Sequence, residues 1–181
     1  MSGAAAPGLF AKLPSSLIGH GQPIVRFKGS SNLHYEGELV VVIGKRASRI
    51  SKKDASQFIF GVTAGNDVSE RSWQSSDLQW LRAKAADGFG PVGPVVVRGL
   101  NYNDLLVQTR LNGEVRQKES SKNMIHGVDA IVSYVSRYFT LLPGDLIYTG
   151  TPGSTRAMQP GDVVEVEVQG VGVLRNPIVS D

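Results

Sequence analysis

Three acidic side chains have the types and spacing best suited to chemistry in this sequence. Glu36 and Glu38 lie two positions apart in a run rich in β-branched and aromatic residues, which ends at Gly44 and is typical of a strand. Strand side chains alternate between two faces, so both glutamates project from the same face. Asp67 follows in a Gly-Asn-Asp-Val-Ser segment and would add a third negative charge.

Three carboxylates that share one site need an opposite charge beside them. At about 4 Å and an effective dielectric constant of about 20, each pair repels by roughly 4 kcal/mol, which protonation or a bound cation must relieve. The sequence has no cysteine, and an all-oxygen ligand set favours a hard divalent ion such as Mg²⁺ or Mn²⁺. The alternative interpretation is a solvated strand face and an aspartate in a turn, because charged side chains are mostly exposed.

The composition is that of a soluble globular protein. A chain of 181 residues fits one domain with a sizeable core, and its contents of 41% hydrophobic and 19% charged residues are ordinary. The net charge of +3 is small and the basic residues are scattered, so we expect no nucleic-acid partner. The N-terminus lacks the pattern of a signal peptide, and no aliphatic stretch could span a bilayer. We therefore expect a cytoplasmic protein without a membrane partner.

Turn signals divide the chain into an irregular N-terminal arm, residues 1–32, and a single mainly β domain with a few short helices, residues 33–181. Strands are expected at 24–27, 34–43, 59–64, 95–97, 107–111, 146–148 and 163–168, and helices at 51–58, 69–81 and 127–138. Ser51 and Ser69 are the expected N-caps of the first two helices.

The order of motifs along the chain resembles that of the fumarylacetoacetate hydrolase family. His-Tyr-Glu-Gly-Glu-Leu at 34–39 is similar to the family's Glu-x-Glu strand, and Gly-Asn-Asp-Val-Ser follows at 65–69. The likeness continues at 89–94, 112–114, 142–145, 148–153, 160–163 and 172–177, and covers roughly residues 10–179. The resemblance implies a mixed β-roll, usually a homodimer, whose substrates are small 2-oxo acids or their enols.

The resemblance also implies roles for individual residues. The residues that match the family's metal ligands are Glu36, Glu38 and Asp67. The residues that match positions lining its pocket are Arg71, Gln74 and Lys84, and Thr151 matches the threonine of its Gly-Thr-Pro loop. Without the resemblance, Arg71 would be interpreted as a helix residue in a local ion pair, and Thr151 as part of a turn.

These roles fit the chemistry of 2-oxo acids. Such an acid can chelate a divalent ion through one carboxylate oxygen and its keto oxygen, and the ion then stabilises an enolate as it forms. Lys84 would add a second positive charge near that oxygen. Thr151, with the amides around Gly150 and Gly153, would hold the substrate carboxylate.

Two features depart from the family pattern. Many members carry, upstream of the barrel strands, an Asn-Tyr segment followed by a His and a Glu that activate water. No such segment precedes residue 30, and His20 has no Glu nearby, so we expect a chain shortened at its N-terminus. Ser-Thr-Arg at 154–156 stands where the family often has a Gly-Val pair, so we expect a different fit to the substrate tail.

The leading expectation is C–C bond hydrolysis of an acylpyruvate-like or fumarylacetoacetate-like substrate. Isomerisation (tautomerisation) or decarboxylation of a 2-oxo or 2-hydroxy-dienoic diacid stands close behind, as in 2-hydroxyhepta-2,4-diene-1,7-dioate isomerase or oxaloacetate decarboxylase, because neither needs an activated water. A rival hypothesis is a catalytically silent metal-binding domain that serves as an oligomer partner. Retention of Lys84 and Thr151 beside the three acids argues against silence.

Overall fold

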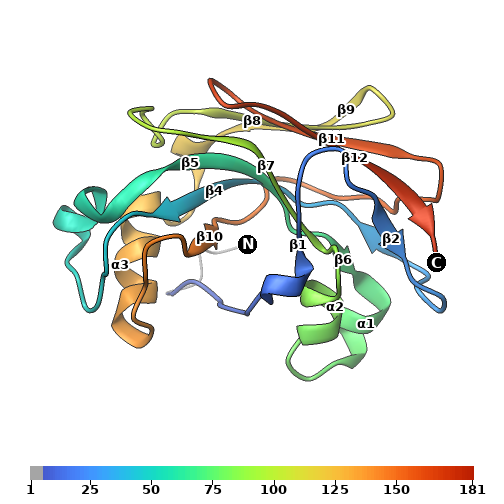
Figure 1. Ribbon diagram of the computed structural model, residues 1–181, viewed down its shortest axis with the longest axis horizontal. Helices are drawn as coiled ribbons and strands as arrows, with labels where there is room; N and C mark the ends of the chain where they lie inside the picture. The colour runs from blue at the N-terminus through green and yellow to red at the C-terminus, as the bar shows by residue number, and fades with distance from the viewer. Residues whose placement is uncertain (1–5) are drawn as a thin grey trace.

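Two five-stranded sheets, one curling over the other, form the body of the protein (Figure 1). The computed structural model describes residues 6–181. The first sheet contains, in spatial order, β1 (Leu17–Ile18), β7 (Gly90–Val97), β5 (Ile59–Asn66), β4 (Gly37–Ile43) and β10 (Leu146–Tyr148). The second contains β2 (Ile24–Arg26), β12 (Gly172–Ser180), β11 (Val163–Val168), β8 (Leu106–Leu111) and β9 (Glu114–Ser120). A separate antiparallel pair joins β3 (Leu33–His34) to β6 (Ser69–Glu70).

Short helices lie at the ends of the sheets rather than between them. They are α1 (Arg71–Ser76), α2 (Leu81–Ala85) and α3 (Val128–Tyr138), with 3₁₀ turns η1 (Pro14–Ser16), η2 (Lys52–Phe58) and η3 (Ser121–Asn123). In Figure 1, α3 covers one flank of the sheets, and α1 and α2 lie together below the opposite end. Within residues 6–181, none of the helices has the length and apolar character needed to cross a membrane.

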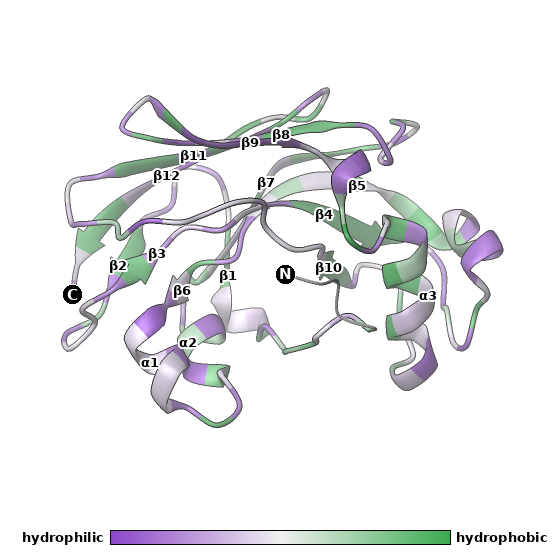
Figure 2. Cartoon of the chain, turned by 180° about the vertical axis from the view of Figure 1, so that it is seen from behind, coloured by the Kyte–Doolittle hydropathy of each residue, from purple (hydrophilic) through white to green (hydrophobic). Residues whose placement is uncertain are grey.

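The core follows from the alternation of side chains along the strands. Leu39, Val41 and Ile43 of β4 are buried in one apolar cluster together with Val107 of β8 and Val166 of β11. Figure 2 shows this hydrophobic colouring along β4, β8 and β11. Residues at even positions of β4 project from the opposite face. The packing of the two sheets therefore fixes the face on which Glu38 lies.

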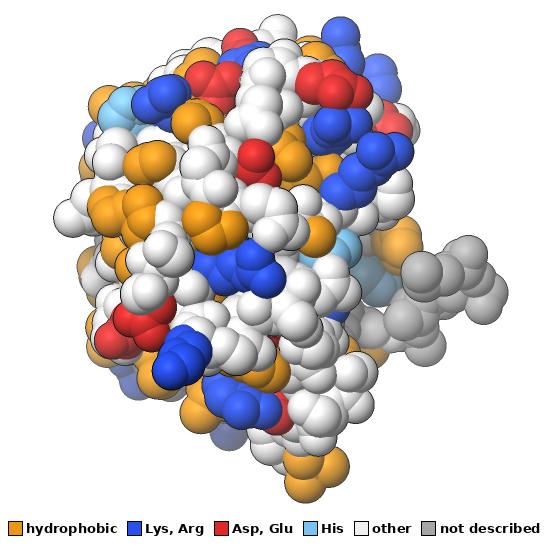
Figure 3. Space-filling view, turned by 90° about the vertical axis from the view of Figure 1, so that its right-hand side faces the viewer, with side chains coloured by type: hydrophobic (Ala, Val, Ile, Leu, Met, Phe, Trp, Pro, Cys, Tyr) orange, Lys and Arg blue, Asp and Glu red, His pale blue; other side chains and the backbone are white. Residues whose placement is uncertain are grey.

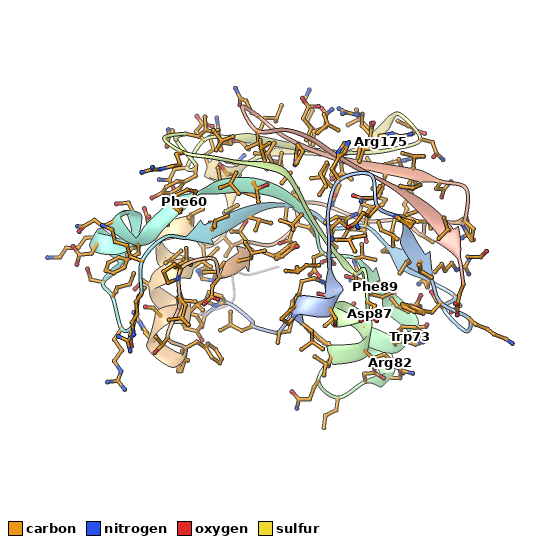
Figure 4. The ribbon with its side chains drawn as sticks, in the orientation of Figure 1. Phe60, Trp73, Arg82, Asp87, Phe89 and Arg175 are labelled. Carbon is orange, nitrogen blue, oxygen red and sulfur yellow. The ribbon has the colours of Figure 1, made fainter. Side chains whose placement is uncertain are left out.

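A second cluster holds α1 and α2 against the end of the sheets. Trp73 of α1 stacks on Phe89, with ring centroids 6.4 Å apart and ring planes 14° apart. The Arg82 guanidinium of α2 lies 4.8 Å from the Trp73 ring centroid, and Figure 4 shows these three side chains together. This contact connects the two helices that carry Arg71 and Lys84.

The outer face of the second sheet carries mixed charges. Arg110 of β8 donates hydrogen bonds to Glu165 at 3.0 Å and to Glu167 at 2.6 Å, both on β11. Figure 3 shows a comparable mixture of basic, acidic and hydrophobic side chains on one side of the molecule. Charges of opposite sign are thus interspersed on these surfaces.

The prediction of a mainly β fold with few helices is confirmed. The strand expected at 34–43 is interrupted at Tyr35 and Glu36, so that β3 ends at His34 and β4 begins at Gly37; Glu36 lies just before β4, and Glu38 lies within it.

Two long strands, β9 and β12, were not predicted. β9 carries charged residues such as Glu114 and Lys118, and β12 contains Pro177, so neither has the apolar alternation of an obvious strand. β7 begins at Gly90, well before the predicted start at Val95.

The prediction of a single helix over residues 69–81, capped by Ser69, was wrong. The helix begins after Glu70, whose carboxylate accepts the N–H of Ser72 at 3.1 Å, and ends at Ser76. Ser69 lies in β6 instead, and its hydroxyl donates to the Asp67 carbonyl oxygen. A second helix starts at Leu81 after Trp80 adopts a left-handed backbone conformation with φ 58°. The buried Glu70 carboxylate therefore caps the helix in place of Ser69. Its oxygens also accept hydrogen bonds from Ser30 and Asn32, in the loop before β3.

The N-terminal segment contributes to both sheets. β1 pairs with β7 in parallel, and β2, which was predicted, pairs with β12 in parallel. Between residue 6 and β1, the chain runs beneath the first sheet (Figure 1). This path brings the N-terminal segment to the side of the sheet on which Glu38 lies.

Candidate metal centre

The antiparallel pairing of β4 with β5 brings the three predicted carboxylates together. Gly37 lies opposite Asn66 in the ladder, so Glu36 and Asp67, the residues just beyond this pair, face each other. The N–H of Asp67 donates to the Glu36 carbonyl oxygen at 2.8 Å, and the Asn66 side chain accepts the Glu36 N–H at 2.8 Å. One carboxylate oxygen from each acid lies within 4.8 Å of the others.

All three carboxylates are withdrawn from solvent. The exposed fractions are 9% for Glu36, 3% for Glu38 and 1% for Asp67. Burial, reinforced by the negative charges of Asp67 and Glu36, raises the pKa of Glu38 well above its usual range. A buried cluster of this kind binds protons or cations in preference to remaining fully charged.

Lys84 lies inside this cluster. Its side chain is 3% exposed, and its ammonium nitrogen lies 2.6 Å from Glu36 Oε2 and 2.8 Å from Asp67 Oδ2. The Phe10 ring covers it, with the ring centroid 4.8 Å from the nitrogen. One ammonium thus joins two carboxylates of the cluster, where a divalent cation could also supply positive charge.

Lys12 is a second buried cation at the site, and the sequence analysis missed it. Its ammonium nitrogen lies 2.6 Å from Asp67 Oδ1 and also donates to the Lys84 carbonyl oxygen. Burial lowers the pKa of Lys12, although the adjacent Asp67 opposes that effect. The available signal was a single lysine within the apolar segment Leu-Phe-Ala-Lys-Leu-Pro, residues 9–14.

Arg71 and Gln74 form the rim of the cluster. Arg71 donates to Glu36 Oε1 at 2.6 Å, to Gln74 Oε1 at 2.8 Å and to Thr155 Oγ1 at 3.0 Å. Thr155 also contacts His34 Nδ1 at 2.8 Å. His34 is therefore linked to Glu36 through Thr155 and Arg71. Burial and the Arg71 charge lower the pKa of this histidine.

The predicted Gly-Thr-Pro loop, residues 150–152, closes the other side. The Gly150 N–H donates to Glu38 Oε2 at 2.8 Å. The Thr151 hydroxyl donates to the Gly37 carbonyl oxygen at 2.9 Å and accepts from Gln117 Nε2 at 2.9 Å. In this arrangement the Thr151 hydroxyl holds the loop on the strand between the two glutamates.

A cavity of ≈ 490 Å³ adjoins this loop. One wall is formed by residues 149–153, another by residues 119–126, and its buried apolar part by Leu39, Val107 and Ile131. Gly150 belongs to both features, since its N–H holds Glu38 and its backbone lines the cavity. Glu36, Glu38, Asp67 and Lys84 do not line this cavity, and Leu39 lies on the opposite face of β4 from Glu38.

The residues present fit a divalent cation. The cluster offers three buried carboxylates with converging oxygens, the donor type that Mg²⁺ and Mn²⁺ prefer. Basic side chains pair with Glu36 and Asp67 in the structure, which shows that these two positions attract positive charge.

Comparison with known proteins decides the family. The sequence profile of the fumarylacetoacetate (FAA) hydrolase C-terminal family matches residues 2–179. The chain belongs to the fumarylacetoacetate hydrolase family. The fold agrees, because it superimposes with a TM-score of 0.96 on 2-hydroxyhepta-2,4-diene-1,7-dioate isomerase from Mycobacterium marinum, with 44% identity over 98% of this chain and 70% of that one.

Members of the fumarylacetoacetate hydrolase family similar to this chain differ in their reactions. The 4-hydroxyphenylacetate degradation bifunctional isomerase/decarboxylase of Escherichia coli is 41% identical over 97% of this chain and 42% of its own length. Fumarylpyruvate hydrolase from Pseudomonas aeruginosa, solved in complex with Mn²⁺ and pyruvate, is 28% identical over 95% of this chain and 78% of that one, with a TM-score of 0.89. Isomerase, decarboxylase and hydrolase activities thus occur on this fold, and one such relative binds Mn²⁺.

Proposed function

We propose that this protein is a divalent-metal-dependent enzyme that acts on a small 2-oxo acid by stabilising its enolate. The observation that carries the proposal is the buried cluster of Glu36, Glu38 and Asp67, with the Lys84 ammonium within hydrogen-bond distance of two of them. The complex of the P. aeruginosa relative with Mn²⁺ and pyruvate, itself a 2-oxo acid, supports the same chemistry.

The three carboxylates would hold the cation, Mg²⁺ or Mn²⁺. When bound, the cation would supply Lewis-acid stabilisation of negative charge on the keto oxygen. Lys84 would then contribute a second positive charge to the same oxygen, because a bound cation satisfies the carboxylates that now hold its ammonium. The buried ammonium would attract negative charge on that oxygen strongly, because little water screens it.

The remaining residues would orient the substrate. Arg71 and Gln74 lie side by side on the rim and present N–H donors suited to a carboxylate or keto oxygen. The loop from Gly150 to Gly153 would lie beside the substrate carboxylate. In the structure the Gly150 N–H and the Thr151 hydroxyl, which we expected to hold that carboxylate, donate instead to Glu38 and to the Gly37 carbonyl oxygen.

Keto–enol isomerisation is the outcome that these residues support best. It needs an enolate and the movement of one proton, which a site rich in carboxylates and ammonium groups can supply. The M. marinum isomerase and the E. coli isomerase/decarboxylase are also more similar to this chain than the P. aeruginosa hydrolase is. Hydrolysis of a C–C bond, the leading expectation from the sequence, becomes the second candidate. The fumarylacetoacetate hydrolase of Exiguobacterium antarcticum, 39% identical over 99% of this chain, favours it.

A substrate screen tests the proposal. Purified protein with Mg²⁺ or Mn²⁺ is incubated with oxaloacetate, acylpyruvates and unsaturated 2-oxo diacids, and enol, decarboxylated and hydrolysed products are scored separately. Activity on one of these classes that requires the metal and is lost in Glu36→Gln supports the proposal. Metal binding without turnover of any 2-oxo acid would instead favour the catalytically silent domain.

A further inference from the structure

Gly37, the residue between the two glutamates, lies at the end of β4, beyond the residues that pair with β10. β10 pairs with β4 only as far as Val40, opposite Tyr148. Beyond that point the backbone groups of β4 on this side have no neighbouring strand, and a buried N–H or C=O without a partner is costly. Side chains from elsewhere in the fold supply the missing hydrogen bonds at Gly37.

Gln117 of β9 is one of these side chains. Its Oε1 accepts the Gly37 N–H at 3.2 Å, while its Nε2 donates to Thr151 Oγ1 at 2.9 Å and to the Pro152 carbonyl oxygen at 2.6 Å. Thr151 Oγ1 in turn donates to the Gly37 carbonyl oxygen at 2.9 Å. Both donors and the acceptor of this one amide are therefore used, and it is only 5% exposed.

These hydrogen bonds form a closed ring between three segments. The ring joins Gly37, Gln117 and Thr151, and it lies next to both Glu36 and Glu38 along the chain. The loop held by the ring also supplies the Gly150 N–H that fixes Glu38 Oε2 at 2.8 Å. A change in the ring would thus alter both the backbone between Glu36 and Glu38 and the loop whose Gly150 N–H hydrogen-bonds Glu38.

We propose that Gln117 is a positioning residue of the metal centre, which sets the separation between the Gly150–Pro152 loop and the backbone that carries Glu36 and Glu38. This inference rests on the proposed metal-dependent function. Gln117 itself contacts none of the three carboxylates through a hydrogen bond that the structure describes. It acts through the backbone of Gly37 and through Thr151.

The test is a calorimetric titration of metal-free protein with Mn²⁺. Gln117→Met keeps the length of the side chain and removes its three hydrogen bonds. We expect its Mn²⁺ dissociation constant to rise about tenfold, as is typical when a residue that orients metal ligands is lost. Gln108→Met is the matched control. Gln108 lies on the adjacent strand β8, one position from the inward-facing Thr109, and therefore on the other face. Its variant should bind Mn²⁺ within about twofold of the wild type.

A residue with a merely structural role would lower the thermal midpoint without changing the Mn²⁺ affinity of the folded protein. Circular dichroism confirms that each variant is folded at the titration temperature. If Gln117→Met does not fold, Thr151→Val decides, because it breaks the same ring from the loop side without adding charge. Wild-type Mn²⁺ affinity in the deciding variant would overturn the inference. Failure of the wild-type protein to bind Mn²⁺ would count against the proposed function itself.

Discussion

The Lys84 ammonium nitrogen lies 2.6 Å from Glu36 Oε2, within a site where both side chains are largely buried. The same nitrogen lies 2.8 Å from Asp67, so removal of its charge leaves two carboxylates with a weaker partner. These two contacts make Lys84 both a counter-ion of the carboxylates and a candidate for stabilising negative charge on a substrate.

Replacement of Lys84 should separate catalysis from metal binding. Lys84→Met removes a positive charge that helps most in the transition state, and such a loss costs roughly 3 kcal/mol, about a hundredfold in turnover. Metal affinity should not fall, because the ammonium competes with a cation for the same oxygens. Steady-state kinetics on any active substrate and a Mn²⁺ titration measure the two effects. Lys118→Met, an exposed lysine of β9, is the control. Full turnover in Lys84→Met would remove this residue from the mechanism.

Lys12 should matter most when no metal is bound. Breaking a buried ion pair while one charge remains costs about 3 kcal/mol, so Lys12→Met should destabilise the metal-free protein by roughly that amount. Mn²⁺ should recover a large part of the loss, since it would replace the charge beside Asp67. Urea unfolding with and without Mn²⁺ tests this, with exposed Lys28→Met as control. An equal loss of stability in both conditions would contradict the expected exchange of charge.

Gly37 should tolerate no side chain. A Cβ at this position would lie 1.9 Å from Thr109 Oγ1, so Gly37→Ala should destabilise the fold by about 2 kcal/mol through overpacking. Removing the obstructing hydroxyl in Gly37→Ala/Thr109→Ala should restore part of the stability. Gly19→Ala, where a Cβ would meet nothing nearer than 3.7 Å, is the control. Strict additivity of the two changes in denaturant unfolding would show that this contact is not the cause.

Glu70 should make stability depend on acid pH. Burial opposes its charge, but hydrogen bonds from Ser30, Ser72 and Asn32 outweigh that effect and hold its pKa below the ordinary value of 4.5. A lowered pKa stabilises the fold at any pH above the ordinary pKa of 4.5. This stabilisation is lost as the pH falls below 4.5 and through the pKa of the folded state. The free energy of unfolding, measured with urea between about pH 7 and pH 3, should therefore decrease more steeply with falling pH in the wild type than in Glu70→Gln. Parallel curves would contradict this.

The sequence indicated the residues of the carboxylate cluster more completely than the neighbouring side chains and strands that hold them in place. Glu36, Glu38 and Asp67 could be found because alternation along a strand and family motifs identify them, and Lys84 because its motif neighbours do. Lys12 could not be found, since its contact with Asp67 depends on the path of the N-terminal segment beneath the sheet. β9 and β12 each form a hairpin with the strand just before them, β8 and β11, but could not be predicted because their own residues carry little apolar alternation.

The predicted homodimer stays a prediction. Apolar side chains of the N-terminal segment remain partly exposed in the single chain, at 45% for Leu9, 40% for Phe10 and 43% for Leu13. These values agree with the expectation that the segment needs a partner to cover it. Light scattering at micromolar protein concentration, with metal present, would show a dimer if the expectation holds.

The central claim is that Glu36, Glu38 and Asp67 bind one divalent cation. Calorimetric titration of the metal-free protein with Mn²⁺ should give one site per chain, largely lost in Glu38→Gln. Glu167→Gln is the matched control, because Glu167 pairs with Arg110 on the outer face of the second sheet and should not affect binding. Wild-type Mn²⁺ affinity in Glu38→Gln would contradict the assignment of the metal centre.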